Sequence, residues 1–97
     1  MITITRSLAR RLKTVIRQSL SPPRNADPPV FFSLTGGELT ARAACKRAAI
    51  EYRAQGDHGD NGLLTVPLKL LGECAGHGES PVTLQQDQNL VLVRWNG

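Results

Sequence analysis

Residues 6–24 contain half of the chain's basic side chains and no acidic one, and much of this segment is patterned as a two-faced helix. From Ser7 to Leu20 the apolar side chains recur at helical intervals, which predicts one buried stripe. Ser7 is the expected N-cap of this helix. The stripe consists of Leu8, Leu12, Val15, Ile16 and Leu20. At roughly 100° per residue, the opposite face collects Arg6, Arg10, Lys13 and Arg17, with Thr14 and Gln18 beside them.

This basic face lacks the partners that an ordinary solvated helix has. Unlike charges four residues apart stabilise a helix, and like charges there repel each other. The first acid of the chain is Asp27, beyond the predicted helix. We therefore expect the basic face to meet an anionic partner, with a plain solvated face as the alternative.

Charge is distributed unevenly along the 97 residues, which are enough for one small domain covering residues 1–97. Residues 1–24 carry six bases and no acid, whereas residues 25–97 carry six bases and eight acids. The net charge of +4 therefore comes from a strongly basic first helix on a mildly acidic body. This polarity favours a polyanion as the partner.

An Arg-rich, acid-free start is also typical of an organellar transit peptide or of a membrane-surface helix. Met1–Thr5 argues against both interpretations, because it alternates apolar and polar residues as a half-buried strand does. No apolar run approaches the roughly 20 residues of a membrane span, and no secretory signal is visible. The two cysteines, Cys45 and Cys74, form no disulfide framework, so we expect reduced thiols and a cytoplasmic location.

The predicted elements occur in an order that repeats. The first half has a strand, the basic helix, a Pro-rich connection that no helix could cross, and three more strands. After a Gly-rich surface loop the second half has a strand, a short helix and two strands. The predicted ranges are Met1–Thr5, Ser7–Leu20, Ser21–Pro29, Val30–Leu34, Glu38–Ala44, Ala48–Gln55, Gly56–Gly62, Leu63–Val66, Leu68–Ala75, Val82–Gln86 and Leu90–Trp95.

Three local signals define the ends of these elements. Thr35–Gly37 predicts a hairpin turn, and Pro67 and Gly76 bracket the short helix at its start and end. Leu68, Leu71 and Cys74 would face inward from that helix. The fold class predicted from this order is α+β: a duplicated βαβββ unit, with two helices packed on antiparallel sheets and the final strand missing.

This order and length resemble one domain of the DNA sliding clamps, in particular the N-terminal domain of the bacterial clamps, the beta subunits of DNA polymerase III. The likeness covers nearly the whole chain, and its most specific parts are the Val66-Pro67 junction between strand and helix and the order of the elements. It rests on Ile2–Ile4, the basic helix, Arg24 in the Pro-rich loop, Gly37–Thr40, Thr65–Leu71, Val82–Leu84 and Leu90–Arg94.

In that family, domains join edge to edge into a ring whose helices line a hole for duplex DNA. The resemblance implies a non-enzymatic DNA-binding module without a cofactor. Arg and Lys contacts to phosphate bind DNA without reading its sequence, as a sliding ring requires. The DNA-binding residues carried over are Arg6, Arg10, Lys13, Arg17, Arg24 and Lys69.

The chain also departs from the family pattern. It holds one domain where bacterial clamp subunits hold three, and it reaches Trp95–Gly97 where a further strand would follow. Ala43–Arg47 stands where the family usually has a Thr-Asp pair, and Glu73 weakens the basic character that Lys69 gives the second helix. The family's pocket for partner peptides belongs largely to later domains, so no residue of this chain is assigned to it.

The last predicted strand is apolar on both faces, at Leu90, Val91, Leu92 and Val93, and uncharged until Arg94. An edge strand of this kind invites pairing with another chain. We therefore expect a homo-oligomer, with replication proteins as further partners. Two alternatives stay open: a clamp-like module that binds clamp or replication proteins without DNA, and a nucleic-acid binder that docks duplex without a ring.

Other sequence patterns give weaker indications of a functional site. Cys74 and His77 have a spacing that a metal could use, but a site needs about four ligands, and Cys45 and His58 could join only through folding. Asp57–Asp60 lacks the ligand register of a calcium loop. No nucleophile, base and orienting group occur together, so no enzyme and no metal site are expected. The aromatic residues Phe31, Phe32, Tyr52 and Trp95 sit in strand patterns and are expected in the core.

Overall fold

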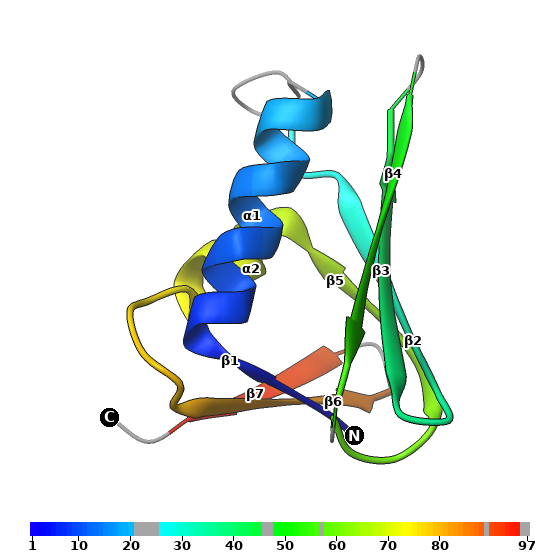
Figure 1. Ribbon diagram of the computed structural model, residues 1–97, viewed down its shortest axis with the longest axis vertical. Coiled ribbons are helices and arrows are strands. Elements are labelled where there is room, and N and C mark those ends of the chain that lie inside the picture. The colour runs from blue at the N-terminus through cyan, green and yellow to red at the C-terminus, as the bar shows by residue number, and fades with distance from the viewer. Residues whose placement is uncertain (21–25, 46–47, 57, 89, 96–97) are drawn as a thin grey trace.

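The computed structural model describes residues 1–20, 26–45, 48–56, 58–88 and 90–95, with the side chain of Trp95 left out. The described residues form two helices and seven strands, in the order that the sequence predicts (Figure 1). They are β1 (Ile2–Thr5), α1 (Arg6–Leu20), β2 (Pro29–Thr35), β3 (Glu38–Ala44), β4 (Ala49–Gln55), β5 (Gly62–Pro67), α2 (Leu68–Cys74), β6 (Pro81–Asp87) and β7 (Leu90–Trp95).

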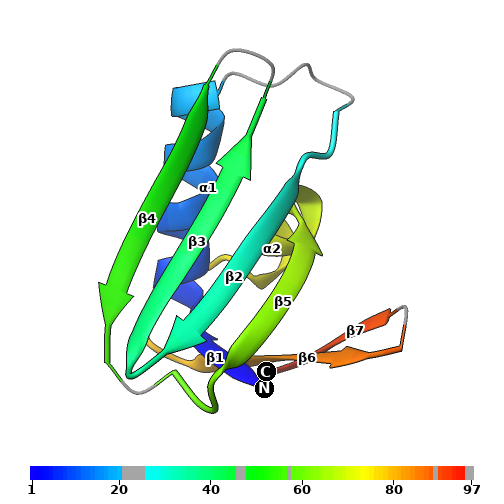
Figure 2. The same cartoon turned by 90° about the vertical axis from the view of Figure 1, so that its right-hand side faces the viewer.

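The strands form two antiparallel sheets, one in the order β1-β6-β7 and the other in the order β4-β3-β2-β5 (Figure 2). The strand before each helix joins the sheet formed by strands of the other half of the chain, since β1 pairs with β6 and β5 pairs with β2. The two sheets diverge, and both helices fill the space between them (Figure 1). The predicted α+β class, with helices packed on antiparallel sheets, is confirmed.

The β2–β3 hairpin turns at Gly36 and Gly37, with Thr35 paired to Glu38. Both glycines have positive φ, 58° and 83°. A two-residue turn with positive φ at both central positions matches the right-handed twist of the strands and favours glycine. The predicted turn is therefore confirmed.

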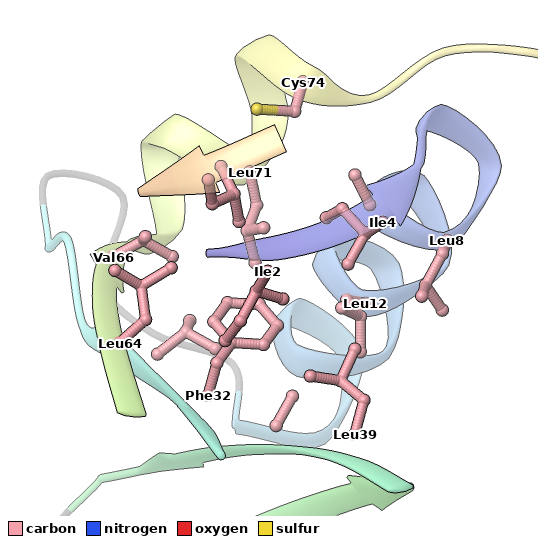
Figure 3. Close-up of a cluster of buried hydrophobic side chains, with 14 of the residues drawn as sticks. Ile2, Ile4, Leu8, Leu12, Phe32, Leu39, Leu64, Val66, Leu71 and Cys74 are labelled. Atoms are coloured by element: carbon pink, nitrogen blue, oxygen red, sulfur yellow. The ribbon is translucent and has the colours of Figure 1, made fainter. Parts of the chain in front are cut away.

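One apolar core joins both sheets and both helices. From α1 it receives Leu8, Ala9, Leu12, Ile16 and Leu20, while Val15 is half-buried at the border of the stripe. Figure 3 shows Leu12 close to Leu39 and Phe32, between the two sheets. The remaining buried residues are Ile2, Ile4, Val30, Phe32, Leu34, Leu39, Ala41, Ala43, Leu64, Val66, Leu68, Leu71, Cys74, Val82 and Leu84.

Helix α1 begins one residue earlier than predicted, and its N-cap is Thr5 rather than Ser7. Thr5 Oγ1 accepts a hydrogen bond from the Leu8 N–H at 3.0 Å, which satisfies a free donor of the first turn. Ser7 instead donates from Oγ to Glu79 Oε1 at 2.9 Å. The Ser7 assignment was wrong because the preceding strand runs directly into the helix.

Helix α2 buries Leu68, Leu71 and Cys74, as predicted, but it ends one residue early. Pro67 is its N-cap residue, and Ala75 follows it in an extended conformation. Gly76 has no positive φ, so it does not serve as a left-handed helix cap. Glycine is instead needed at position 76 because the Arg6 side chain of α1 occupies the space beside it.

Two predictions about side chains fail in part. Phe31 lies on the outer face of β2 and is 50% exposed, because strand alternation places its neighbour Phe32 in the core. Tyr52 is half-buried.

In the loop after β4, His58 is hydrogen-bonded to β1: its carbonyl accepts from the Thr3 N–H at 2.7 Å, and its Nδ1 lies 3.0 Å from the Thr3 carbonyl oxygen.

Neither described helix is both long enough and apolar enough to span a membrane.

The central residues of the α1 stripe should dominate stability. Leu12 and Ile16 are 1% and 3% exposed, so Leu12→Ala or Ile16→Ala should each lower the free energy of unfolding by about 2–5 kcal/mol. Arg10→Ala removes an exposed side chain and should cost less than about 1 kcal/mol. Denaturant unfolding of the three variants measures this ranking. A larger loss for Arg10→Ala would mean that α1 packs through its basic face.

Candidate nucleic-acid interface

The exposed side of α1 presents the basic residues that the sequence singles out. Arg10 and Arg17 are exposed, and Lys13 between them is half-buried. Together with Thr14 and Gln18 they line an open groove of about 450 Å³, whose other wall is Ala75 and Gly76. The predicted clustering of these five side chains on one face is therefore observed, with a wall that the sequence did not reveal.

Among the residues that the structure describes, no acidic side chain lines this groove. Within the described ranges the ion pairs lie elsewhere, on the outer face of the β4-β3-β2-β5 sheet, where Glu51 meets Arg42 at 3.2 Å and Arg53 at 3.4 Å. The Arg42 guanidinium holds the pKa of Glu51 below its usual range. The cations of the groove thus have no acidic partner in the described ranges, and charge of one sign favours an anionic ligand.

The start of α1 is held by residues 75–80. The Arg6 N–H donates to Ser80 O and the Ser7 N–H to Gly78 O, both at 3.1 Å, and Gly76 N–H donates to Arg6 O at 3.2 Å. These bonds occupy the first N–H groups of the helix. The helix end is therefore not an anion site, and the connection after α2 fixes where α1 begins.

Arg6 is separated from the other bases of α1. Its side chain is half-buried, its Nη2 donates to Ala75 O at 3.2 Å, and its Nε is buried without a partner in the described part of the chain. A Cβ on Gly76 would lie 2.6 Å from that Nε, so only glycine leaves room for the guanidinium. Arg6 thus joins α1 to the end of α2 and does not line the groove.

Of the two remaining predicted contacts, only Lys69 lies in the described part of the chain, and it does not line the groove. Lys69 is exposed in the first turn of α2, and its N–H donates to Asp27 Oδ1 at 2.9 Å. Asp27 thus supplies α2 with a cap from a distant part of the chain. Arg24 lies in residues 21–25, outside the described residues.

Sequence reasoning missed the wall formed by Ala75 and Gly76, and with it Gly72, which lies against Lys13. The available signal was the pair Gly72 and Gly76 near the end of the short helix. Gly76 could be explained as a helix end, but no turn explains Gly72. Small residues leave no periodic pattern, so only the packing of α1 against α2 reveals their role.

The predicted oligomer edge is an edge strand. Within the described residues β7 pairs only with β6. Val91 and Val93 pack against the core, whereas Leu90 is 68% exposed and Leu92 is half-buried. Leu90 pairs with Asp87 and Leu92 pairs with Gln85, so both leucines lie on the outer face of the sheet.

The structure does not bring the cysteines and histidines together into a cluster. Cys74 points into the core and His77 is exposed, while Asp57 lies outside the described residues. Among the described residues no group of three or more metal-ligating side chains occurs.

The chain matches no protein-family model, no curated protein and no solved structure.

The two thiols should differ sharply in reactivity. Burial raises the pKa of the Cys74 thiol, so at neutral pH it stays protonated and shielded, whereas Cys45 is exposed. Titration of the native protein with a chromogenic disulfide reagent should modify Cys45 rapidly and Cys74 only after unfolding in denaturant. Rapid reaction of both thiols in native protein would contradict the inward position of Cys74. A Cys45→Ser variant gives the control trace.

Proposed function

We propose that this chain is a non-enzymatic module that binds duplex DNA through the basic face of α1, contacting phosphates without sequence preference. The observation that carries the proposal is the groove holding Arg10, Lys13 and Arg17, with no acid among the described residues that line it. Salt-dependent, sequence-independent binding is what Arg and Lys contacts to phosphate supply.

The packing of α1 argues for phosphates over base edges. The helix is covered by the core along its apolar stripe and lies against α2, so one face is free. A helix that reads bases must enter the major groove and present side chains deep inside it. A helix flanked in this way supports contacts along the DNA backbone.

The same packing weakens the interpretations of the N-terminus as a membrane helix or transit peptide. A surface helix inserts its apolar face into lipid, but in this fold that face is buried in the core. The preceding residues form β1 and pair with β6, so this segment is an integral part of the folded domain.

We propose a sliding-clamp-like architecture as the setting for this interface. Support comes from the order of elements, which runs β-α-β-β-β and then β-α-β-β, and from the reciprocal pairing of β1 with β6 and β5 with β2. On this proposal the second half lacks its last strand, and β7 is the edge that a neighbouring copy would extend. Replication proteins are the further partners that such a role implies.

A second candidate function is protein binding without DNA. Phe31 is 50% exposed and Leu63 81% exposed on the outer face of the β4-β3-β2-β5 sheet, in a hollow of about 560 Å³ that also contains Arg42, Glu51 and Arg53. Exposed apolar side chains rimmed by charges are typical of protein interfaces. Retained binding to replication proteins in a variant with no affinity for DNA would favour this function.

Mixed-sequence duplex should bind weakly, with a log affinity that falls steeply as log salt rises. Replacing Arg10, Lys13 and Arg17 together with Ala should lower the magnitude of that slope by about three at most, since each phosphate contact contributes about one. Fluorescence anisotropy with labelled duplex at several salt concentrations measures both quantities.

A charge-matched comparison isolates the face. Arg10→Ala/Arg17→Ala and Arg42→Ala/Arg53→Ala remove the same charge, but the second pair lies on the outer sheet face. Only the first pair should weaken binding strongly. An unchanged affinity and slope in the triple variant would show that α1 does not face DNA.

Edge pairing through β7 should make the protein a homo-oligomer, with a symmetric dimer as the commonest form. Leu92→Lys places a charge on this edge strand and should shift the protein toward monomer, because edge charges oppose strand addition. Gln85→Lys puts the same charge opposite Leu92 on the central strand β6 and should leave the assembly intact.

Mass measurement in solution, with and without duplex, reads out the assembly. A wild-type monomer at high micromolar concentration, with the amides of residues 90–95 protected from exchange, would contradict edge pairing. DNA binding by such a monomer would support docking without a ring.

A further inference from the structure

We propose that Gly72 is a positioning residue that holds the Lys13 side chain along α2, with its ammonium group at the edge of the groove. The inference rests on the proposed binding of DNA phosphates by Lys13 and adds how that side chain is held. Gly72 itself contacts no phosphate and acts only through Lys13.

The contact involves the far end of the lysine. A Cβ built on Gly72 would lie 3.3 Å from Lys13 Nζ, 3.4 Å from Cε and 3.5 Å from Cδ. Lys13 is accordingly half-buried, whereas Arg10 and Arg17 on the same face are exposed. The lysine stem therefore lies against the α2 surface at a position where no side chain occupies it.

Nothing in the backbone of α2 requires glycine at position 72. Gly72 lies within the seven-residue helix Leu68–Cys74 and has no positive φ, unlike Gly36 and Gly37 in the hairpin turn. Glycine inside a helix is less stable than alanine because it loses more backbone freedom on folding. The local helix thus gives up stability at the place where Lys13 approaches.

Close packing of the stem has a consequence for binding. A free lysine loses much rotamer freedom when its ammonium is held by a phosphate. A lysine already confined against α2 has less freedom left to lose, so its contact with an anion is stronger. A methyl group on residue 72 meets the flexible end of the lysine, which swings away and gives up this advantage.

Gly76 shows the same arrangement in a tighter form. A Cβ on Gly76 would lie 2.6 Å from Arg6 Nε and 2.9 Å from Cζ, and the guanidinium is fixed by its bond to Ala75 O. Arg6 is anchored within the fold, whereas Lys13 only rests against α2 and keeps its ammonium beside the groove. Gly76 therefore makes room for a basic side chain that joins α1 to α2, whereas Gly72 makes room for one that stays beside the groove.

A double-mutant cycle on the full chain tests the proposal with Gly72→Ala, Lys13→Ala and the two combined. Gly62→Ala is the matched control, because a Cβ on Gly62 meets nothing within 4 Å. Each protein is assayed by thermal melting and by anisotropy with a mixed-sequence duplex.

Gly72→Ala should raise the melting temperature by about 3 °C while weakening duplex binding about threefold. Lys13→Ala should weaken binding about fivefold, and adding Gly72→Ala to it should change the affinity no further. Gly62→Ala should leave the affinity unchanged. Higher stability together with lower affinity is a combination that a purely structural role of Gly72 does not produce.

The outcomes separate this inference from the proposed function. If Gly72→Ala weakens binding equally with and without Lys13, or leaves binding unchanged while Lys13→Ala weakens it, the positioning role is overturned and the DNA interface stands. If Lys13→Ala alters neither affinity nor salt slope, the proposed contact of Lys13 with DNA fails first. A lower melting temperature for Gly72→Ala together with unchanged duplex binding would show that Gly72 serves packing alone, and it would overturn the positioning role.

Discussion

Reciprocal strand pairing between the two halves of the chain determines the rest of this structure. β1 pairs with β6 and β5 pairs with β2, so each sheet contains strands from both halves. Because each helix directly follows the strand that crosses to the other sheet, α1 and α2 are both drawn into the space between the sheets (Figure 1). The apolar stripe of α1 is therefore buried in the core between the sheets, and its basic face is turned away from the core.

The groove is a product of this arrangement. The bonds from Arg6 and Ser7 to the connection after α2 fix the start of α1, and the Arg6 guanidinium over Gly76 fixes its approach to α2. One base of the helix is thereby used for folding, while Arg10, Lys13 and Arg17 stay available at the surface. The three bases concentrate positive charge on one side of the helix, and such a charge favours an anionic ligand.

Much of the fold was predictable because its signals are local. Helical periodicity located α1, alternation located the strands, and Gly36-Gly37 located a turn whose backbone demands glycine. Two errors have local causes: Thr5 caps α1 through the Leu8 N–H three residues on, and strand alternation turns Phe31 outward because Phe32 is buried. The site was predictable as a face, through Arg10, Lys13 and Arg17, but Arg6 was placed there because periodicity cannot reveal a contact with residues 75 and 76.

The sequence by itself determined the elements, the unneutralised charge of α1 and the apolar character of β7, because each follows from the spacing of neighbouring residues. Only the tertiary structure decided which strands pair across the halves, which basic side chains remain free, and why Gly72 and Gly76 are small. These depend on contacts between residues far apart in the chain. Such contacts leave no local pattern, since a glycine that makes room for a distant side chain resembles any other glycine in the sequence.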